Sequence, residues 1–96
     1  MSEVHTVRNQ ERDRYEAFVG DELAGFAEYR LRDGIIEFTH TEVDDAFEGH
    51  GVGSTLARDA LDDVRRDGSR RVVASCPFIK EWIEHHPDYE DLLEAA

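Results

Sequence analysis

Cysteine and lysine are almost absent from this chain of 96 residues, in which Cys76 is the only cysteine and Lys80 the only lysine. A single cysteine cannot form a disulfide within the chain, and such usage is typical of a cytoplasmic protein. The sequence also lacks an apolar run of about 18 residues, which a transmembrane helix requires. Its first residues lack the basic and apolar regions of a signal peptide. We therefore expect a cytoplasmic protein with one domain over residues 1–96.

Basic residues are outnumbered throughout, with 23 Asp and Glu against 11 Lys and Arg and a formal net charge of -12. No basic patch is present to meet phosphates, which argues against a nucleic-acid partner. An acidic surface attracts cations such as polyamines or basic peptides, or it keeps a protein hydrated in a high-salt cytoplasm. Acids spread along the whole chain favour the second, halophilic interpretation. We expect a monomer without a membrane partner.

Alternating apolar residues in the first half of the chain predict four strands, at residues 4–9, 15–19, 23–31 and 35–43. The Asp33-Gly34 pair between the last two is a hairpin signal, and Gly20 opens a turn between the second and third. This part of the chain therefore predicts an antiparallel meander.

The apolar period then changes to that of a helix, which we expect to start at Val52 and stop at Gly68. A short strand at 71–76, a helix at 78–86 after Pro77 and a last turn at 89–93 follow. A strand, a helix and another strand form a βαβ crossover, so the fourth and fifth strands should pair in parallel. The apolar face of the first helix comprises Val52, Leu56, Ala57, Ala60, Leu61 and Val64.

Three glycines, Gly49, Gly51 and Gly53, stand at alternate positions between the fourth strand and this helix. Glycine lets another molecule approach the backbone, and a helix start offers unpaired N–H groups at the positive end of its dipole. Together they favour a phosphate or pyrophosphate site over a merely tight connection, for which one glycine suffices. No lysine follows the last glycine, which argues against a Walker-type loop.

Several segments are similar to one family. The Glu48-x-x-Gly51-x-Gly53 loop and the order of the elements resemble GNAT acetyltransferases. The segments 40–43 (His-Thr-Glu-Val), 76–78 (Cys-Pro-Phe) and Pro87-x-Tyr89 resemble more specifically the small YjdJ-type GNAT-like proteins. The similarity extends from about Val4 to Leu93. Family loops commonly open with Gln or Arg, so Glu48 is a departure that places a carboxylate near the expected pyrophosphate.

The resemblance implies an α+β, GNAT-like fold with a mixed, mostly antiparallel sheet, one βαβ crossover and flanking helices. It also implies acetyl-CoA as cosubstrate, no metal, and acetyl transfer to a small-molecule or peptide amine. The pantetheine arm would lie where the fourth and fifth strands splay apart, bonded by the backbone of 41–43. The implied cofactor-binding residues are Thr41, Val43, Gly49, His50, Gly51, Val52, Gly53, Ser54 and Thr55.

Three residues are candidates for the chemistry: Cys76, His40 and Glu42. Cys76 is a buried small apolar residue, a nucleophile favoured by a helix N-terminus, or an unreactive part of the acetyl pocket. Strand alternation predicts His40 on the face of Ile36 and Phe38, near Cys76, as a general base or a structural residue. The same alternation places Glu42 on that face, where it would relay a proton through water.

Other residues allow two interpretations. Tyr89 would protonate the leaving thiolate, a common GNAT role, or pack the last turn onto the sheet. His85 and His86 lack a recurring ligand spacing and are interpreted as a polar helix end. The leading hypothesis is an N-acetyltransferase, and the alternative is a non-catalytic acyl-CoA-binding or sensing module. Nothing in the sequence specifies the acceptor.

Overall fold

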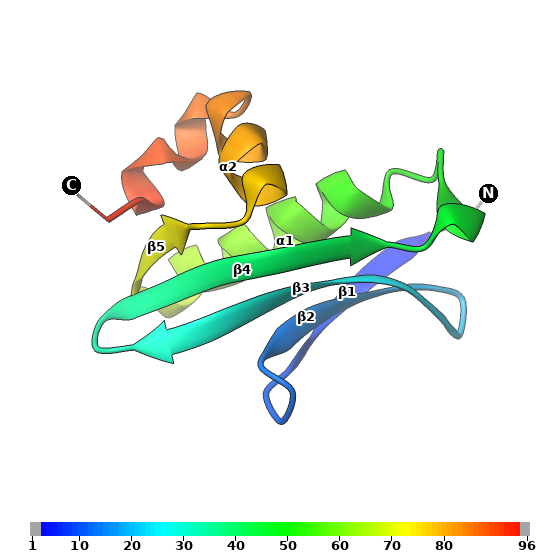
Figure 1. Cartoon of the computed structure of the whole chain (residues 1–96), viewed down its shortest axis with the longest axis horizontal. Helices are drawn as coiled ribbons and strands as arrows, with labels where there is room; N and C mark the ends of the chain where they lie inside the picture. Colours follow the sequence, from blue (N-terminus) through cyan, green and yellow to red (C-terminus); the bar gives the residue numbers. More distant parts are fainter. Residues whose placement is uncertain (1–2, 95–96) are drawn as a thin grey trace.

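A computed structural model describes residues 3–94 of the chain (Figure 1). Five strands form one sheet in the order β1-β2-β3-β4-β5, which is also their order in the sequence. The elements are β1 (Val4–Asn9), β2 (Arg14–Val19), β3 (Glu22–Arg32), β4 (Ile35–Val43), η1 (Asp45–Phe47), α1 (Val52–Asp67), β5 (Arg71–Ala74), α2 (Pro77–Glu84) and η2 (Pro87–Leu92).

The first four strands form the predicted antiparallel meander, and β4 and β5 pair in parallel across the predicted crossover. Gly20 and Gly34 hold the two tight turns with φ values of 62° and 67°, a region that glycine adopts without steric cost. β5 ends at Ala74 rather than at Cys76. The backbone N–H groups of Ser75 and Cys76 both donate to the carbonyl oxygen of Phe38, after which the chain turns into α2.

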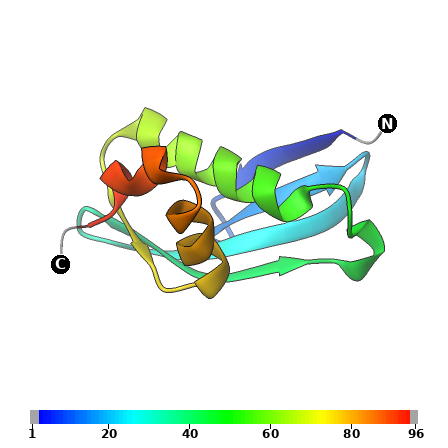
Figure 2. The same cartoon turned by 90° about the horizontal axis from the view of Figure 1, so that it is seen from above.

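Both helices pack on one face of the sheet, as Figures 1 and 2 show from two directions. The predicted apolar face of α1 is buried, and α1 ends where Gly68 donates to the carbonyl oxygen of Val64. Ile79, Trp82 and Ile83 of α2 join the same core. Within residues 3–94 no helix covers the opposite face, and none is long and apolar enough to cross a membrane.

A β-bulge interrupts β4 in its middle. Glu28 of β3 lies opposite His40, whereas the next residue, Tyr29, lies opposite Phe38, so Thr39 is an extra residue in β4. An extra residue in one strand reverses the alternation of the side chains that follow it. Even-numbered residues of β4, such as Ile36 and Phe38, therefore face the helices before the bulge, and odd-numbered residues face them after it.

The prediction that His40 and Glu42 share a face with Ile36 and Phe38 is wrong for this reason. Phe38 is fully buried under the helices, but the His40 and Glu42 side chains are 55% and 61% exposed on the outer face. Thr41 takes the helix-facing position instead, where its hydroxyl contacts the Cys76 thiol. The bulge thus exchanges the residues that a regular strand would present on each side.

Candidate functional site

The carboxyl-terminal half of β4 has an open edge. β4 is paired with β5 only from Ile35 to Phe38, where the two backbone N–H groups of 75–76 meet the Phe38 carbonyl at 3.1 and 2.9 Å. Beyond that point, among residues 3–94, β3 is the only strand beside residues 39–43. An unpaired strand edge presents N–H and C=O groups that can bind an extended chain. The open edge thus arises because β5 ends at Ala74 while β4 continues to Val43, and not because two continuing strands splay apart as expected.

The N-terminus of α1 follows this open edge after a short loop. Gly51 is the N-cap, with φ 73° and ψ 23°, and the first turn contains no acidic residue. The N–H of Thr55 donates to Gly51 at 3.0 Å and closes the first helical turn. The N–H groups before Thr55 have no partner inside a helix and lie at the positive end of its dipole. This end of α1 can accept an anion.

The predicted cofactor-binding glycines serve different purposes. Gly49 and Gly51 adopt positive φ values of 88° and 73°, and a Cβ added to either would meet nothing within 4 Å. Their backbone is thus open to a ligand. Gly53 lies inside α1, where a Cβ would come within 2.8 Å of the Phe78 ring. Its lack of a side chain lets Phe78 of α2 rest on the first turn of α1.

Other predicted cofactor residues differ in what they can offer. The Val52 side chain is buried in the core, which leaves its backbone alone to contact a ligand. Ser54 accepts a hydrogen bond from Trp82 Nε1 at 3.1 Å and so connects the two helices, a contact that sequence reasoning missed. His50 is exposed, and its ring meets the edge of the Phe47 ring with centroids 6.0 Å apart.

Cys76 lies at the point where β5 leaves β4. It is the N-cap of α2, it is only 3% exposed, and its sulfur lies 3.2 Å from Thr41 Oγ1. The structure therefore brings together two residues that were predicted for different reasons, Thr41 for its backbone and Cys76 for its thiol. Within residues 3–94, the Thr41 hydroxyl is the side-chain hydrogen-bond partner found for this thiol.

His40 and Glu42 form a second group on the other side of β4. His40 Nε2 and Glu42 Oε2 are 3.6 Å apart, and the His40 ring lies 6.2 Å from the Phe26 ring. Because the pair is exposed, water screens its attraction and it adds little to stability. The pair is instead accessible to a molecule that approaches the outer face at the open edge.

Tyr89 lies away from both groups. Its hydroxyl donates to Asp62 Oδ1 at 2.7 Å, on the part of α1 remote from the glycine loop, and this bond raises the pKa of Tyr89. The Tyr89 ring packs edge-on against Trp82, which also stacks on His86 at 3.8 Å. These contacts match the packing interpretation of Tyr89. No group of three or more His, Cys, Asp or Glu residues suited to a metal ion occurs in the described part of the chain.

Comparison with known families identifies the family to which the chain belongs. Residues 14–92 match the family model described as GCN5-related N-acetyl-transferase. The match covers well over half of the chain, so the chain belongs to the GCN5-related N-acetyltransferase (GNAT) family.

Relatives of known sequence match only a part of the chain. The NATD1 proteins of Bos taurus and Homo sapiens are 38% and 34% identical to it over 53 residues. Each match covers 55% of this chain and 46% of the relative. The chain thus aligns with about half the length of these curated relatives.

Solved structures share the whole fold. The solution structure of a GCN5-like protein from Staphylococcus aureus has a TM-score of 0.72 at 26% identity, covering 100% of this chain and 93% of that one. A ribosomal-protein-alanine N-acetyltransferase from Brucella melitensis has a TM-score of 0.59 at 20% identity, covering 91% and 66%. The mixed five-stranded sheet with its helices is therefore the fold of GNAT acetyltransferases.

Proposed function

We propose that this protein transfers an acetyl group from acetyl-CoA to an amine. The observation that carries the proposal is that two features follow one another along the described chain: the edge of β4 at 39–43, which β5 does not pair, and the α1 N-terminus at Gly51, which has no side-chain cap. The first suits the amide-bearing pantetheine arm, and the second suits a pyrophosphate. Family membership supports the same ligand.

The residues present fit such a ligand. The backbone of Thr41 and Val43 would bond the pantetheine amides, and the N–H groups of Gly49, Gly51 and Gly53 would hold the pyrophosphate. The space around Gly49 and Gly51 is open to it, and the Ser54 and Thr55 hydroxyls begin the same helix. When bound, acetyl-CoA supplies the acetyl group as a thioester.

The geometry favours direct attack by the amine. The amine nitrogen would give its lone pair to the acetyl carbon, forming a C–N bond as the C–S bond breaks and CoA leaves as the thiolate. His40, assisted by Glu42, would accept the one proton that the amine loses and pass it through water to the thiolate, because both residues are reached from the outer face. Cys76 and Thr41 lie across the strand and would line the acetyl pocket. Cys76 has the α2 N-terminus to favour a thiolate, but its side-chain partner Thr41 is not a base that could take the thiol proton.

The wider setting belongs to the same proposal. We place the protein in the YjdJ-type subgroup, in the cytoplasm of a cell with high internal salt. It would act as a monomer without metal, membrane or nucleic-acid partners. The acidic composition supports the high-salt setting, and the segments 40–43 and 76–78 support the subgroup.

Calorimetric titration with CoA tests the binding step. Gly51→Asn puts a side chain where the pyrophosphate would lie, and asparagine tolerates positive φ better than most residues. Gly34→Asn is the matched control, because Gly34 has a φ of 67° and equally open surroundings in a distant turn. We expect Gly51→Asn to abolish CoA binding while both variants stay folded. Equal affinities in the two variants would refute the site.

Steady-state acetylation of a panel of amines and peptides tests the reaction. Transfer that exceeds the spontaneous hydrolysis of acetyl-CoA supports an enzyme. Binding of CoA without transfer to any acceptor would instead support the acyl-CoA-binding or sensing module.

A further inference from the structure

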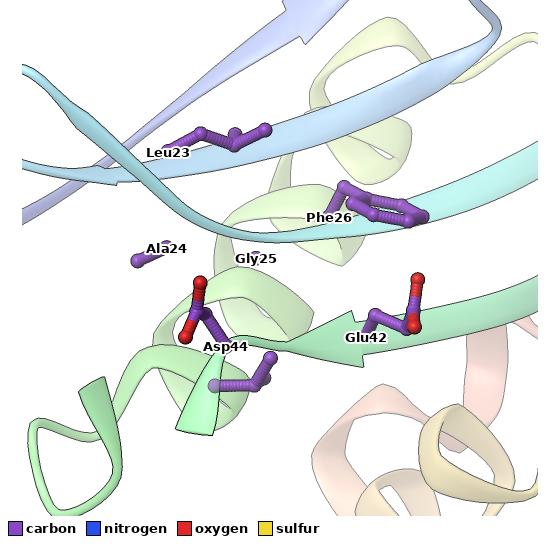
Figure 3. A pocket seen from close by; sticks show the side chains of 7 residues that line it. Leu23, Ala24, Gly25, Phe26, Glu42 and Asp44 are labelled. Atoms are coloured by element: carbon purple, nitrogen blue, oxygen red, sulfur yellow. The ribbon is translucent and has the colours of Figure 1, made fainter. Parts of the chain in front are cut away.

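A pocket of about 200 Å³ opens on the outer face of the sheet, between the start of β3 and the end of β4. Figure 3 shows it from outside, with the helices behind the sheet. Its volume is below the roughly 300–1,000 Å³ that is usual for drug-sized ligands, so it suits a small and slender molecule. Its lining residues are Leu23, Ala24, Gly25, Phe26, Glu42, Val43 and Asp44.

Close contact between two strands shapes the floor of this pocket. A Cβ on Gly25 would come within 2.6 Å of the Glu42 carbonyl oxygen, so glycine alone permits this approach. Leu23 and Phe26 of β3 form an apolar wall, and Leu23 is 39% exposed. An exposed leucine beside a phenylalanine offers a surface for an aliphatic chain.

Two carboxylates from β4 and its end form the other side. Glu42 and Asp44 both line the pocket, as Figure 3 shows. Asp44 accepts the Ala46 N–H at 2.9 Å, and a carboxylate keeps further acceptor sites after one such bond. The nearby cation Arg14, over the Phe26 ring at 4.5 Å, is already paired with Glu16 at 2.7 Å. The pocket thus favours a positively charged ligand.

The pocket adjoins the proposed reaction site. Glu42 lines it and also lies 3.6 Å from His40, the proposed base. The pocket and the His40–Glu42 pair both lie on the outer face, along the part of β4 that β5 does not pair. A molecule held in the pocket would extend toward that edge, on the opposite side from Cys76 and Thr41.

We infer that this pocket holds the aliphatic stem and a distal ammonium group of an acceptor with two or more amino groups. The inference rests on the proposed function. The nitrogen that attacks must be neutral, since it needs its lone pair, whereas alkylamines are protonated at neutral pH with pKa values near 10. The ammonium group held by Glu42 and Asp44 is therefore a different one from the group that reacts.

Amide chemical shifts followed by NMR, without CoA, test the pocket. Diaminobutane is the probe, and butanediol is its uncharged counterpart of equal length. We expect diaminobutane to shift the amides of residues 23–26 and 42–44, and butanediol to leave them in place. Equal shifts with both compounds, or shifts elsewhere only, would overturn the inference.

Two lysine substitutions separate this site from general attraction to an acidic protein. Leu23→Lys puts a positive charge in the pocket, and Leu31→Lys puts one at the other end of β3, where Leu31 is 40% exposed. Both change the net charge equally. We expect Leu23→Lys to weaken the binding of diaminobutane about tenfold by charge repulsion. Leu31→Lys should change this affinity less than about twofold. Equal effects would contradict the pocket.

CoA titration and acetylation assays on the same samples distinguish the two proposals. Diaminobutane binding at the pocket without CoA binding would support the pocket and refute acetyl transfer. Acetyl transfer with the same KM for butylamine and diaminobutane would support the enzyme and overturn the pocket.

Discussion

The two halves of β4 carry the same kind of backbone in different surroundings. Residues 35–38 pair with strands on both sides and bury Ile36 and Phe38 under the helices. Within residues 3–94, residues 40–43 pair with β3 alone, and His40 and Glu42 are exposed. The bulge at Thr39 separates the halves. One half holds the fold together, and the other half keeps backbone groups available, so stability and ligand binding can be tested separately along one strand.

We call residues 35–38 the closed half of β4 and residues 39–43 the open half. The largest effect is expected in the closed half. Phe38 is fully buried and contacts the rings of Tyr15 and Tyr29. Phe38→Ala should lower the free energy of unfolding by about 3–5 kcal/mol, because it removes a large side chain and leaves a cavity. Chemical denaturation measures this. Thr41→Val in the open half is the comparison, and an equal loss there would remove the distinction between the halves.

Alkaline pH should destabilise the core in which Tyr15 of β2 packs beside Phe38. Burial, followed by the hydrogen bond to Asp63 at 2.7 Å, raises the pKa of Tyr15 well above its ordinary value. The folded state therefore favours the neutral phenol. The resulting stabilisation is complete below pH of about 10 and is lost as the pH rises further.

Tyr15→Phe provides the control for this prediction. Its free energy of unfolding should fall less steeply above pH of about 10 than that of the wild type, after a constant loss of about 1 kcal/mol for the missing hydrogen bond. Parallel curves for the two proteins, followed by denaturation at a series of pH values, would show that Tyr15 does not cause the alkaline loss.

Cys76 lies beside the junction of the two halves, and its substitution distinguishes direct attack by the amine from a covalent intermediate. If the amine attacks directly, Cys76→Ala should keep turnover within about tenfold of the wild type. Intact mass after incubation with acetyl-CoA should show no acetyl group on the wild-type thiol. An acetyl adduct that disappears in Cys76→Ala together with turnover would establish a covalent mechanism instead.

Salt tests the open half with the smallest expected effect. The protein carries a formal net charge of -12, and Asp44, Asp45 and Glu48 precede the glycines. Screening weakens repulsion of the anionic ligand, since the Debye length falls from about 10 Å at 0.1 M to roughly 3 Å at 1 M salt. CoA affinity should therefore rise several-fold over this range.

A steady fall of CoA affinity with salt would contradict this account. It would mean that a basic group dominates the local field. Arg58 and Arg65 are engaged with Asp59 at 3.4 Å and Asp91 at 2.8 Å, which makes that outcome unexpected.

The sequence was sufficient to predict the five strands and the two α-helices, because each has a periodic or punctuating signal, but η1 was not predicted and β5 ends two residues early. The stripe beginning at Val52, the stop at Gly68 and the hairpin at Gly34 are all confirmed. The bulge at Thr39 has no such signal, since it lies in a run of four polar residues, 39–42, in which no apolar alternation fixes which side chains face the core. The prediction for His40 and Glu42 failed at this point, and with it the expected proximity to Cys76.

Contacts between elements were also beyond sequence reasoning. The close approach at Gly25 and the fit of Phe78 against Gly53 depend on how strands and helices are placed in three dimensions. The alternate glycines indicated a ligand loop but could not show that Gly53 also serves packing. Tyr89 was weighed for two roles, and its bond to Asp62 became visible only once η2 lay beside α1.

Backbone amide shifts on titration with CoA test the central claim most directly, because each residue of β4 reports separately. We expect large changes in residues 39–43 and 49–54 and small changes in residues 35–38. Changes of equal size along the whole of β4, or changes confined to the outer face around Leu23 and Phe26, would contradict an open half that binds the cosubstrate.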